Sequence, residues 1–489
     1  MTMTISAQPA KRCARAFRRS LLAATALVAA AAGPAWAGYR FSTTGTYSGT
    51  IIINSAEREF SLSVVSGAVG TFVGILHIEG GMFVPRLNIG STGDGANNGT
   101  IIFAPSAIDR VGGSYVNIFL DAGTAQIGSQ AGRDLLAHER TQVALRSGTL
   151  DLAGQDLAIR SLFTGVDGNE GTVRNNTAGT TAVLALVGAN INSANRIVDG
   201  LGKIRLRKEG NRLLSVVGSQ SYSGGTEFAA GAIQFDKGSP TQSDISIGTG
   251  EILLNAETGN TLQLRAMSQG LALTNDLRFE NGSVVDIPVF HEGSVTLKGA
   301  RSGRGEIRKT SIGTLVLQGD GSQSALRYEV YDGTLRTEGN GDAIGANSSV
   351  AVWTDATLHV AQSDRLSVLS GMGTVQLDAG KQLDIAGVDK ESRFEGQVVG
   401  AGSLRKSGSG ELILTKANSY SGGTVFNNGA IRATADGALG TGKITVEDDN
   451  TELILGETGG VTLNNEIAFN IPGNQGASVR VDEGNISTL

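Results

Sequence analysis

Short runs in which apolar and polar residues alternate recur along most of the chain. Residues 148–152 and 156–159 alternate around a Gly-Gln turn, and residues 374–378 and 382–385 repeat the pattern. Alternation over four to six residues predicts half-buried β-strands, because successive side chains of a strand point to opposite faces. The turns between the runs are rich in Gly and Asn, which tolerate positive φ. Helical periodicity is almost absent, and only residues 133–147 fit a helix as well as a strand.

In addition to this short strand–turn repeat, the chain contains a longer module that recurs. Residues 200–233 and 400–431 share a Gly-x-Gly turn, a strand ending in Lys, a second apolar strand, a Ser-Tyr-Ser-Gly-Gly-Thr element and a Gly-Ala-Ile turn. Residues 303–335 carry a degraded copy that lacks the Tyr-Ser-Gly-Gly-Thr element. The three lysines, at 208, 309 and 406, lie 101 and 97 residues apart. The chain is therefore expected to be a repeat array with a superperiod of about a hundred residues.

Short strands without intervening helices bury a common core when coil stacks on coil. We therefore predict an all-β fold, a right-handed parallel β-helix (solenoid) with about 20–25 residues per coil. A string of β-sandwiches is the alternative, but it requires linkers, and no Pro-rich or Ser-rich linker follows residue 37.

Composition agrees with an ordered, turn-rich protein. Gly contributes 70 of 489 residues, hydrophobic residues 40% and charged residues 18%. Low charge argues against disorder, and the absence of a Gly triplet period argues against collagen. The single Cys excludes a disulfide framework and a Cys-based metal or iron–sulfur site.

Residues 1–37 have the pattern of a cleaved signal peptide. Five basic residues precede the apolar run 21–32, and Ala35-Trp36-Ala37 provides a small-x-small cleavage pattern before Gly38. A general secretory signal is favoured over a twin-arginine signal, although Arg18-Arg19 faintly resembles the latter. Cleavage removes five positive charges from a chain of net charge −6, which leaves −11, and it also removes Cys13. An acidic mature chain argues against nucleic acid as the main partner.

Candidate chemistry is sparse. The carboxylate pairs Asp378/Asp384, Asp151/Asp156 and Asp448/Asp449 lie at strand ends or turns, where Asp is an ordinary turn residue. We expect no catalytic residues, no cofactor site and no metal site. The remaining candidates are four histidines in unrelated contexts, two weak matches to calcium-binding turns, two repeat tyrosines and three Arg-Lys pairs: His77, His138, His291 and His359; residues 90–95 and 339–342; Tyr222 and Tyr420; Arg207 with Lys208, Arg308 with Lys309, and Arg405 with Lys406.

Each of these has a structural interpretation that we prefer. The tyrosines are expected to pack over the Gly-Gly of their own coils rather than to stack on sugars. The basic residues are expected to be solvated turn charges that pair with nearby Glu. The histidines are expected to be structural or surface residues, and the calcium-type turns do not repeat in tandem.

The repeat motif resembles the autotransporter-associated β-strand repeat of bacterial passenger domains, which have a pectin-lyase-like β-helix. Residues 400–431 match it almost completely, residues 200–233 match well, and residues 303–335 match in their first half. The resemblance is clear over about residues 140–489. Residues 38–139 share only the general character of such passengers and no specific motif. The repeat positions expected to be structural are Gly202, Lys208, Tyr222, Gly224, Gly225, Thr226, Gly305, Lys309, Gly402, Lys406, Gly408, Gly410, Asn418, Tyr420, Gly422, Gly423 and Thr424.

The resemblance implies a secreted or outer-membrane-displayed passenger with a structural or adhesive role, whose repeats assist transport across the outer membrane. It divides the chain into a signal peptide (1–37), an N-terminal β-rich passenger region (38–139) and a β-helix with the repeats (140–489). Its expected partners are an outer-membrane translocator barrel, missing from this chain or separate, and surface glycans or host matrix. The sequence stops in the middle of a module, so a fragment or truncated frame is expected. The alternative function is a β-helical carbohydrate-active enzyme, a polysaccharide lyase or hydrolase.

Overall fold

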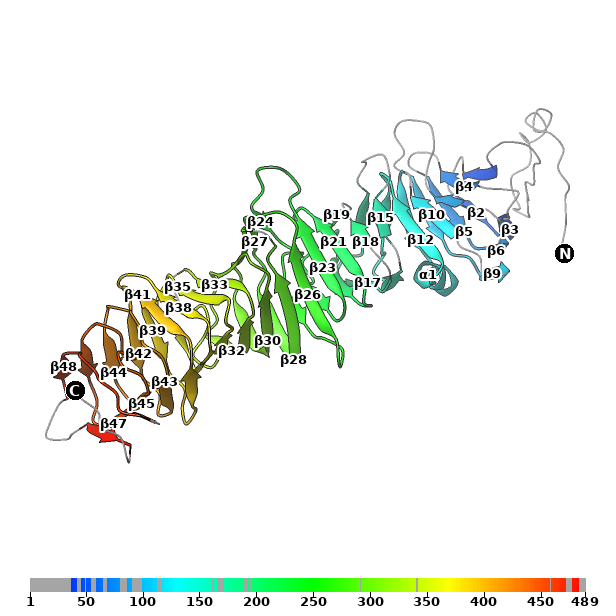
Figure 1. The fold of residues 1–489 in the computed structure, drawn as a ribbon. Helices are drawn as coiled ribbons and strands as arrows, with labels where there is room; N and C mark the ends of the chain where they lie inside the picture. Colours follow the sequence, from blue (N-terminus) through cyan, green and yellow to red (C-terminus); the bar gives the residue numbers. More distant parts are fainter. Residues whose placement is uncertain are drawn as a thin grey trace, which may run out of the picture. The chain divides into compact units, whose positions relative to one another are not determined.

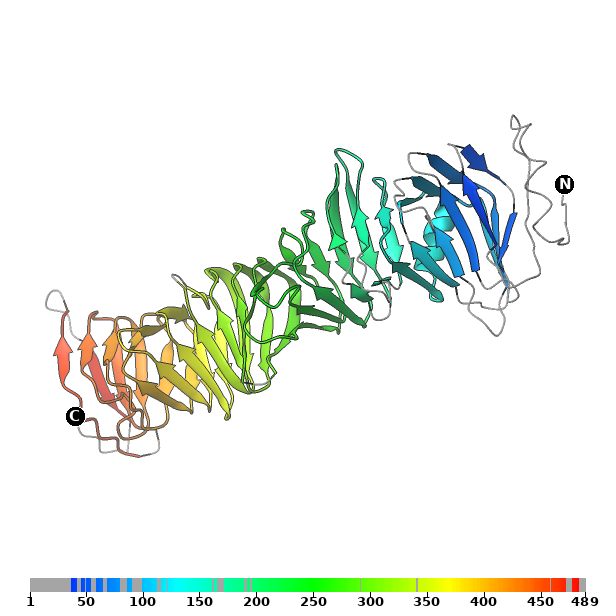
Figure 2. The same ribbon diagram turned by 90° about the horizontal axis from the view of Figure 1, so that it is seen from above.

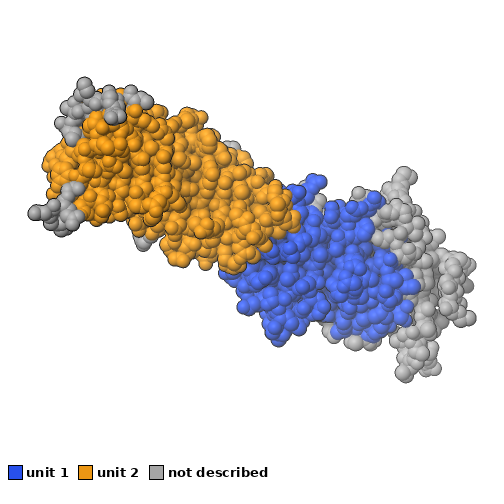
Figure 3. All heavy atoms as spheres, turned by 90° about the horizontal axis from the view of Figure 1, so that it is seen from below, with its two compact units in different colours: residues 1–227, 247–250 blue, residues 228–246, 251–489 orange. Residues whose placement is uncertain are grey.

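The computed structural model describes residues 37–482 except 42–44, 49, 54–58, 65–67, 80–85, 90–98, 112–115, 121, 161, 165–170, 189–190, 194–195, 291, 340–341, 458 and 472–476. The chain divides into two compact units, coloured separately in Figure 3. Unit 1 comprises residues up to 227 together with 247–250, and unit 2 comprises residues 228–246 and those from 251 onward. The predicted signal peptide lies outside the described residues up to position 36, and cleavage between Ala37 and Gly38 remains a prediction.

Unit 1 is built of coils whose strands form three faces, as Figure 1 shows. The first face contains β1 (Ala37–Phe41), β4 (Glu59–Val64), β7 (Arg86–Ile89), β10 (Val116–Leu120), β12 (Thr141–Leu145), β15 (Leu162–Thr164), β18 (Ile191–Ser193) and β21 (Leu213–Val217). The second contains β2 (Gly45–Tyr47), β5 (Val69–Phe72), β8 (Thr100–Phe103), β11 (Thr124–Ile127), β13 (Thr149–Asp151), β16 (Thr172–Arg174) and β19 (Arg196–Ile197). The third contains β3 (Thr50–Ile53), β6 (Ile75–Glu79) and β9 (Ala107–Val111), and later β14 (Leu157–Ile159), β17 (Thr181–Leu186), β20 (Lys203–Lys208) and β22 (Thr226–Phe228), which includes the unit boundary.

The one helix of the described chain, α1 (Gln130–Ala137), contacts both β9 and β14 on the third face of unit 1. The side chain of Ser129 caps its N-terminus by accepting a hydrogen bond from Gly132 N at 3.1 Å. Leu135 and Leu136 point into the core. The ambiguous stretch 133–147 is therefore half helix and half strand, because β12 begins at Thr141.

Unit 2 has the same construction, seen from a second direction in Figure 2. Its first face contains β23 (Ala232–Asp236), β26 (Thr261–Ala266), β28 (Leu277–Pro288), β30 (Arg301–Thr310), β32 (Gln323–Val330), β34 (Ser349–Val352), β37 (Val368–Gly371), β40 (Ser392–Phe394), β43 (Glu411–Leu414), β45 (Gly429–Ala433), β47 (Thr451–Leu455) and β49 (Ser478–Val481). The second contains β24 (Asp244–Ile245), β27 (Leu271–Leu273), β29 (Ser294–Leu297), β31 (Thr314–Leu317), β33 (Gly333–Thr337), β35 (Ala356–Val360), β38 (Thr374–Leu377) and β41 (Gln397–Gly400). The third contains β25 (Ile252–Leu254), which pairs with the start of β28, and then β36 (Asp364–Leu366), β39 (Gln382–Ile385), β42 (Ser403–Lys406), β44 (Thr424–Phe426), β46 (Ile444–Val446) and β48 (Ile467–Phe469).

The pairings between described coils are parallel, and most register steps agree with the predicted coil length, although longer steps occur, such as Val69 to Thr100 and Ala232 to Gln263. Leu404 pairs with Thr424 of the next coil, and Ile252 pairs with Leu277, and these two steps match the lower and upper ends of the predicted range. A string of sandwiches would instead require facing antiparallel sheets. The prediction of an all-β, parallel β-helical fold is confirmed, whereas the domain boundaries drawn from the sequence remain predictions.

The core is made of like residues stacked at the same register position of successive coils. In unit 1 the rings of Tyr47, Phe72 and Phe103 form a column with centroids 5.8 Å apart. In unit 2 the fully buried Leu315 pairs with the equally buried Leu335 of the next coil. Each such side chain contributes about 1.5–3 kcal/mol through burial. The interior is thus a set of apolar columns, which is why alternation in the sequence was so regular.

Candidate functional site: the repeat modules

The lysine of each repeat module points into the coil. Lys208, Lys309 and Lys406 are at most 1% exposed, and each ends or nearly ends a strand whose preceding inward residue is apolar. Their ammonium groups donate to main-chain carbonyls of the turn that follows. Lys208 Nζ donates to Glu209 O and Gly210 O, at 2.8 and 2.6 Å.

The other two copies repeat this arrangement and add a carbonyl from the next coil. Lys309 Nζ donates to Thr310 O, Ser311 O and Asp332 O at 3.2, 2.5 and 2.9 Å. Lys406 Nζ donates to Gly408 O and, at 3.2 Å, to Asn428 O. The lysine therefore supplies hydrogen-bond donors to the main-chain carbonyls of a tight corner.

The expectation that these lysines are solvated was wrong. Burial lowers the pKa of Lys208, Lys309 and Lys406 to about 8, because removal from water disfavours the ammonium form. The neighbouring arginines do point outward and pair with glutamates, as expected. Their contacts are Arg207 Nε–Glu209 at 2.9 Å, Arg308 Nε–Glu306 at 2.5 Å and Arg405 Nη1–Glu447 at 3.2 Å.

The repeat tyrosines are core residues that anchor a polar relay. Tyr222 and Tyr420 are fully buried, and each hydroxyl lies 2.6 Å from the threonine four residues later, Thr226 or Thr424. Thr226 Oγ1 donates to Ile247 O at 2.9 Å, and Thr424 Oγ1 donates to Leu439 O at 3.3 Å. Because each threonine donates to a carbonyl, the tyrosine hydroxyl donates to the threonine. Burial raises the pKa of both tyrosines, and neither ring is available to stack on a ligand.

The ring packs against a glycine of the following coil rather than on its own Gly-Gly. A Cβ on Gly248 would lie 2.5 Å from the Tyr222 ring, and one on Gly440 would lie 3.0 Å from that of Tyr420. The Gly-Gly pair instead brings two main chains together, since a Cβ on Gly422 would lie 2.5 Å from the Gly402 carbonyl. Predicted burial of the tyrosines is correct, but the glycine that accommodates the ring is a different one.

The amide two residues before each tyrosine completes the module. Asn418 Oδ1 accepts from Val398 N at 2.7 Å, and its Nδ2 donates to Ala438 O at 2.6 Å. In the first module Gln220 takes this position and accepts from Ile197 N at 2.7 Å. Gln220 replaces the Asn of the repeat motif, but it is recognisable from the sequence because both amides precede the tyrosine by two residues.

The carboxylate pairs considered as enzymatic candidates bind main-chain N–H groups or neighbouring side chains. Asp378 Oδ1 lies 2.9 Å from His359 Nε2, whereas Asp384 Oδ2 lies 3.2 Å from Arg365 Nε and accepts from Ser407 Oγ. The other pairs bind backbone N–H groups: Asp151 those of Ala153 and Asn176, Asp156 that of Val183, and Asp448 that of Asn450.

The remaining candidates fall partly outside the described residues. His138 Nδ1 accepts from Arg140 N at 3.1 Å, in the turn after α1. His291, the side chain of His77, residues 90–95 and part of 339–342 fall outside what the structure describes. Among the described residues, His, Cys, Asp and Glu form no group of three that could hold a metal ion. Nor does any helix in that part of the chain have the length and apolarity needed to span a membrane.

A buried polar cluster in unit 2 escaped the sequence analysis. Arg301, 1% exposed, donates to Gly299 O, Gly319 O and Ala343 O at 3.1, 2.6 and 2.7 Å. Asp364 lies in the same interior, and burial raises its pKa to about 7. It accepts hydrogen bonds from the backbone N–H groups of Ile344 and Arg365. The burial of Asp364 could have been predicted from the alternation of residues in β36. Asp364 lies two residues before Leu366, so both side chains point to the inward side of the strand.

Comparison with known proteins agrees with the repeat geometry. Residues 404–433 match the family model of the passenger-associated transport repeat. A further similarity is to the adhesin BmaC autotransporter of Brucella suis biovar 1 (strain 1330), 30% identical over 169 residues. The aligned part is 31% of this chain and 4% of the relative, so the chain spans a small fraction of that protein. No solved structure matches this chain.

The resemblance inferred from the sequence is therefore confirmed: the chain has the repeat and the β-helical fold of an autotransporter passenger. The matched segment contains Lys406, Asn418, Tyr420 and Thr424, the side chains that connect successive coils.

Proposed function

We propose that this chain is the adhesive part of an exported passenger, displayed at the cell surface or released from it. The single observation that carries the proposal is the match at residues 404–433, in a module that the structure repeats at Lys208 and Tyr222. The similarity to an autotransporter adhesin supports an adhesive role. A β-helix suits this role, because stacking coils gives extended outer faces without a deep site.

The repeats have a second role in this proposal, which is to assist passage across the outer membrane. A passenger implies a translocator barrel as partner, encoded in the same or another chain. Each completed coil offers a strand edge on which the next coil forms, so folding outside the membrane draws out further chain. The lysine, tyrosine and asparagine side chains tie one coil to the next and make each such step more favourable.

Cell-surface fractionation of the intact gene product tests the proposal. We expect the passenger to be cleaved by protease added to whole cells, and cells that carry it to adhere more than cells with an in-frame deletion of codons 38–489. A periplasmic marker that stays uncleaved serves as the control. Recovery of the passenger solely inside intact cells would contradict display, and unchanged adhesion of the deletion strain would contradict the adhesive role.

A further inference from the structure

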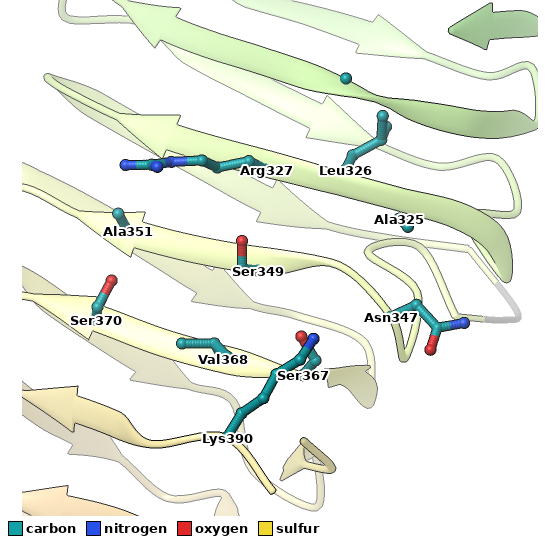
Figure 4. Close-up of a pocket in the computed structure, with 11 residues that line it drawn as sticks. Ala325, Leu326, Arg327, Asn347, Ser349, Ala351, Ser367, Val368, Ser370 and Lys390 are labelled. Atoms are coloured by element: carbon teal, nitrogen blue, oxygen red, sulfur yellow. The ribbon is translucent and has the colours of Figure 1, made fainter. Parts of the chain in front are cut away.

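The first face of unit 2 is hollowed where two neighbouring strands carry small outward residues. The outward residues of β34 include Ser349 and Ala351, and their register partners on β37 are Val368 and Ser370. Figure 4 shows these side chains side by side on the two strands. The resulting trough has a volume of about 360 Å³, which is within the range of small-ligand sites. It is lined by Gly305, Ala325, Leu326, Arg327, Asn347, Ser349, Ala351, Ser367, Val368, Ser370 and Lys390.

Two cationic side chains flank the trough. Arg327 comes from β32 on one side, and Lys390 precedes β40 on the other (Figure 4). The Arg327 side chain is 62% exposed, while its partner Glu329 is only 2% exposed. No carboxylate is among the lining residues, and Lys390 is itself exposed. The lining thus offers two cationic side chains and no carboxylate, although Arg327 is paired with Glu329 and Lys390 lies between Asp389 and Glu391 in the sequence.

Two stacked aromatic rings lie on the outer side of the same face. Tyr331 follows β32 directly and Trp353 follows β34, and their rings stack with centroids 5.7 Å apart and planes 15° apart. Both are substantially exposed, at 40% and 47%. Trp353 Nε1 donates to Glu329 Oε2 at 2.8 Å, and Glu329 also binds Arg327. The indole is thus held in place by the same carboxylate that orients the arginine.

These features specify the chemistry of a ligand. A hydroxyl and amide lining from Ser349, Ser370 and Asn347 suits a partner with many hydroxyl groups. Flat exposed rings suit the C–H face of a sugar ring, and Arg327 with Lys390 suits a carboxylate or sulfate. A floor two strands wide, about 10 Å, accommodates a single saccharide chain.

We propose that this trough binds an acidic saccharide, with Arg327 and Lys390 pairing its acid groups and Trp353 stacking on a sugar ring. The inference rests on the proposed adhesive function and assigns it a surface and a ligand class. Glu329 acts as a positioning residue, since it holds both Trp353 and Arg327 without facing the trough itself.

Isothermal titration of the purified full chain tests the proposal. The probes are hexagalacturonate, which carries carboxylates, a heparin-derived hexasaccharide, which carries sulfates, and neutral maltohexaose. We expect at least one acidic probe to bind and maltohexaose to bind about tenfold more weakly or less, a difference of ~1.4 kcal/mol. The acidic probe that binds tells whether the acid group is a carboxylate or a sulfate.

Variants locate the binding at the trough. Trp353→Ala, Lys390→Ala and Ala351→Trp, which fills the floor, should each weaken the acidic probe about tenfold or more. Matched controls are Phe290→Ala, an exposed ring, Lys443→Ala, an exposed lysine, and Thr296→Trp on the outward side of β29; these should stay within about twofold. Thermal unfolding of every variant confirms that it is folded.

The proposal is overturned if neither acidic probe binds, if maltohexaose binds as tightly, or if trough and control variants lose affinity alike. A cell-adhesion assay with the same variants separates it from the proposed function. Absence of adhesion by the unaltered protein would contradict the proposed function alone, because binding in solution is measured independently. Adhesion that is unchanged by Trp353→Ala would overturn the adhesive role of the trough while the proposed function stands.

Discussion

A lysine two residues after a core leucine lies on the same side of the strand as that leucine. Leu404 and Lys406 in β42 are both buried, and Leu206 and Lys208 in β20 repeat this phase. Alternation therefore indicated burial, whereas charge indicated exposure, and alternation was right. A lysine can be buried here because its ammonium group donates hydrogen bonds to main-chain carbonyls of the corner, which lie inside the coil.

The buried lysines have a defined effect on stability at alkaline pH. The folded pKa of Lys406, about 8, lies below its ordinary value of 10.5, so the unfolded chain binds more protons between these values. The free energy of unfolding then rises with pH over this range. We expect the difference in free energy of unfolding between the unaltered protein and Lys406→Met to increase, in favour of the unaltered protein, by on the order of 2 kcal/mol from pH 8 to pH 10.

Urea denaturation at pH 8, 9 and 10 measures this difference. The matched control is Lys443→Met, which alters an exposed lysine paired with Glu466 and should not reproduce the gain expected over Lys406→Met. Parallel curves for the unaltered protein and Lys406→Met would show that the buried ammonium does not titrate in this range.

At the scale of the element, the repeat module depends on a relay from tyrosine to threonine to a carbonyl of the following coil. Tyr420→Phe keeps the ring but leaves Thr424 Oγ1 without its donor inside the core. We expect a loss of about 1 kcal/mol, the usual effect of one buried hydrogen bond. Urea denaturation provides the measurement, and Tyr331→Phe at an exposed ring should change stability by less than about 0.5 kcal/mol. Equal effects at both positions would contradict the relay.

The elements themselves were largely predictable from sequence, but the connections between coils were not. Alternation indicated strands such as 374–377 and 382–385, because one side of each faces a continuous core. Helix α1 was missed as a distinct element, since eight residues hold little more than two turns of pattern and the cap at Ser129 decides its start. The trough could not be predicted from the sequence, because Ser349 and Ser370 belong to successive coils and become neighbours only through the register of β34 and β37.

Within unit 2 the coil is the interchangeable unit of the molecule. Leu404 pairs with Thr424, and Thr424 pairs with Ile444, so two successive coils have the same length. Deletion of residues 404–423 joins Ser403 to Thr424, which has the register position of Leu404. We expect this variant to keep a β-type circular dichroism spectrum and cooperative thermal unfolding, because each coil contacts only its neighbours.

The matched control deletes half a coil, residues 404–413. It brings strands of different faces into line and moves apolar columns out of register, so we expect loss of cooperative unfolding. A half-coil deletion that unfolds as cooperatively as the full-coil deletion would contradict this view of the coil as the repeating unit.

The position of helix α1 between β9 and β14 has a consequence for the order of folding in unit 1. Parallel coils grow by templating, in which a finished strand presents its free N–H and C=O groups to the next. A helix uses these groups internally and presents no such edge to either neighbour. Templated growth on this face is therefore interrupted at α1, whereas the first and second faces continue past the helix through the pairs β10–β12 and β11–β13. The coils that follow the helix in unit 1 thus depend on those two faces for their template.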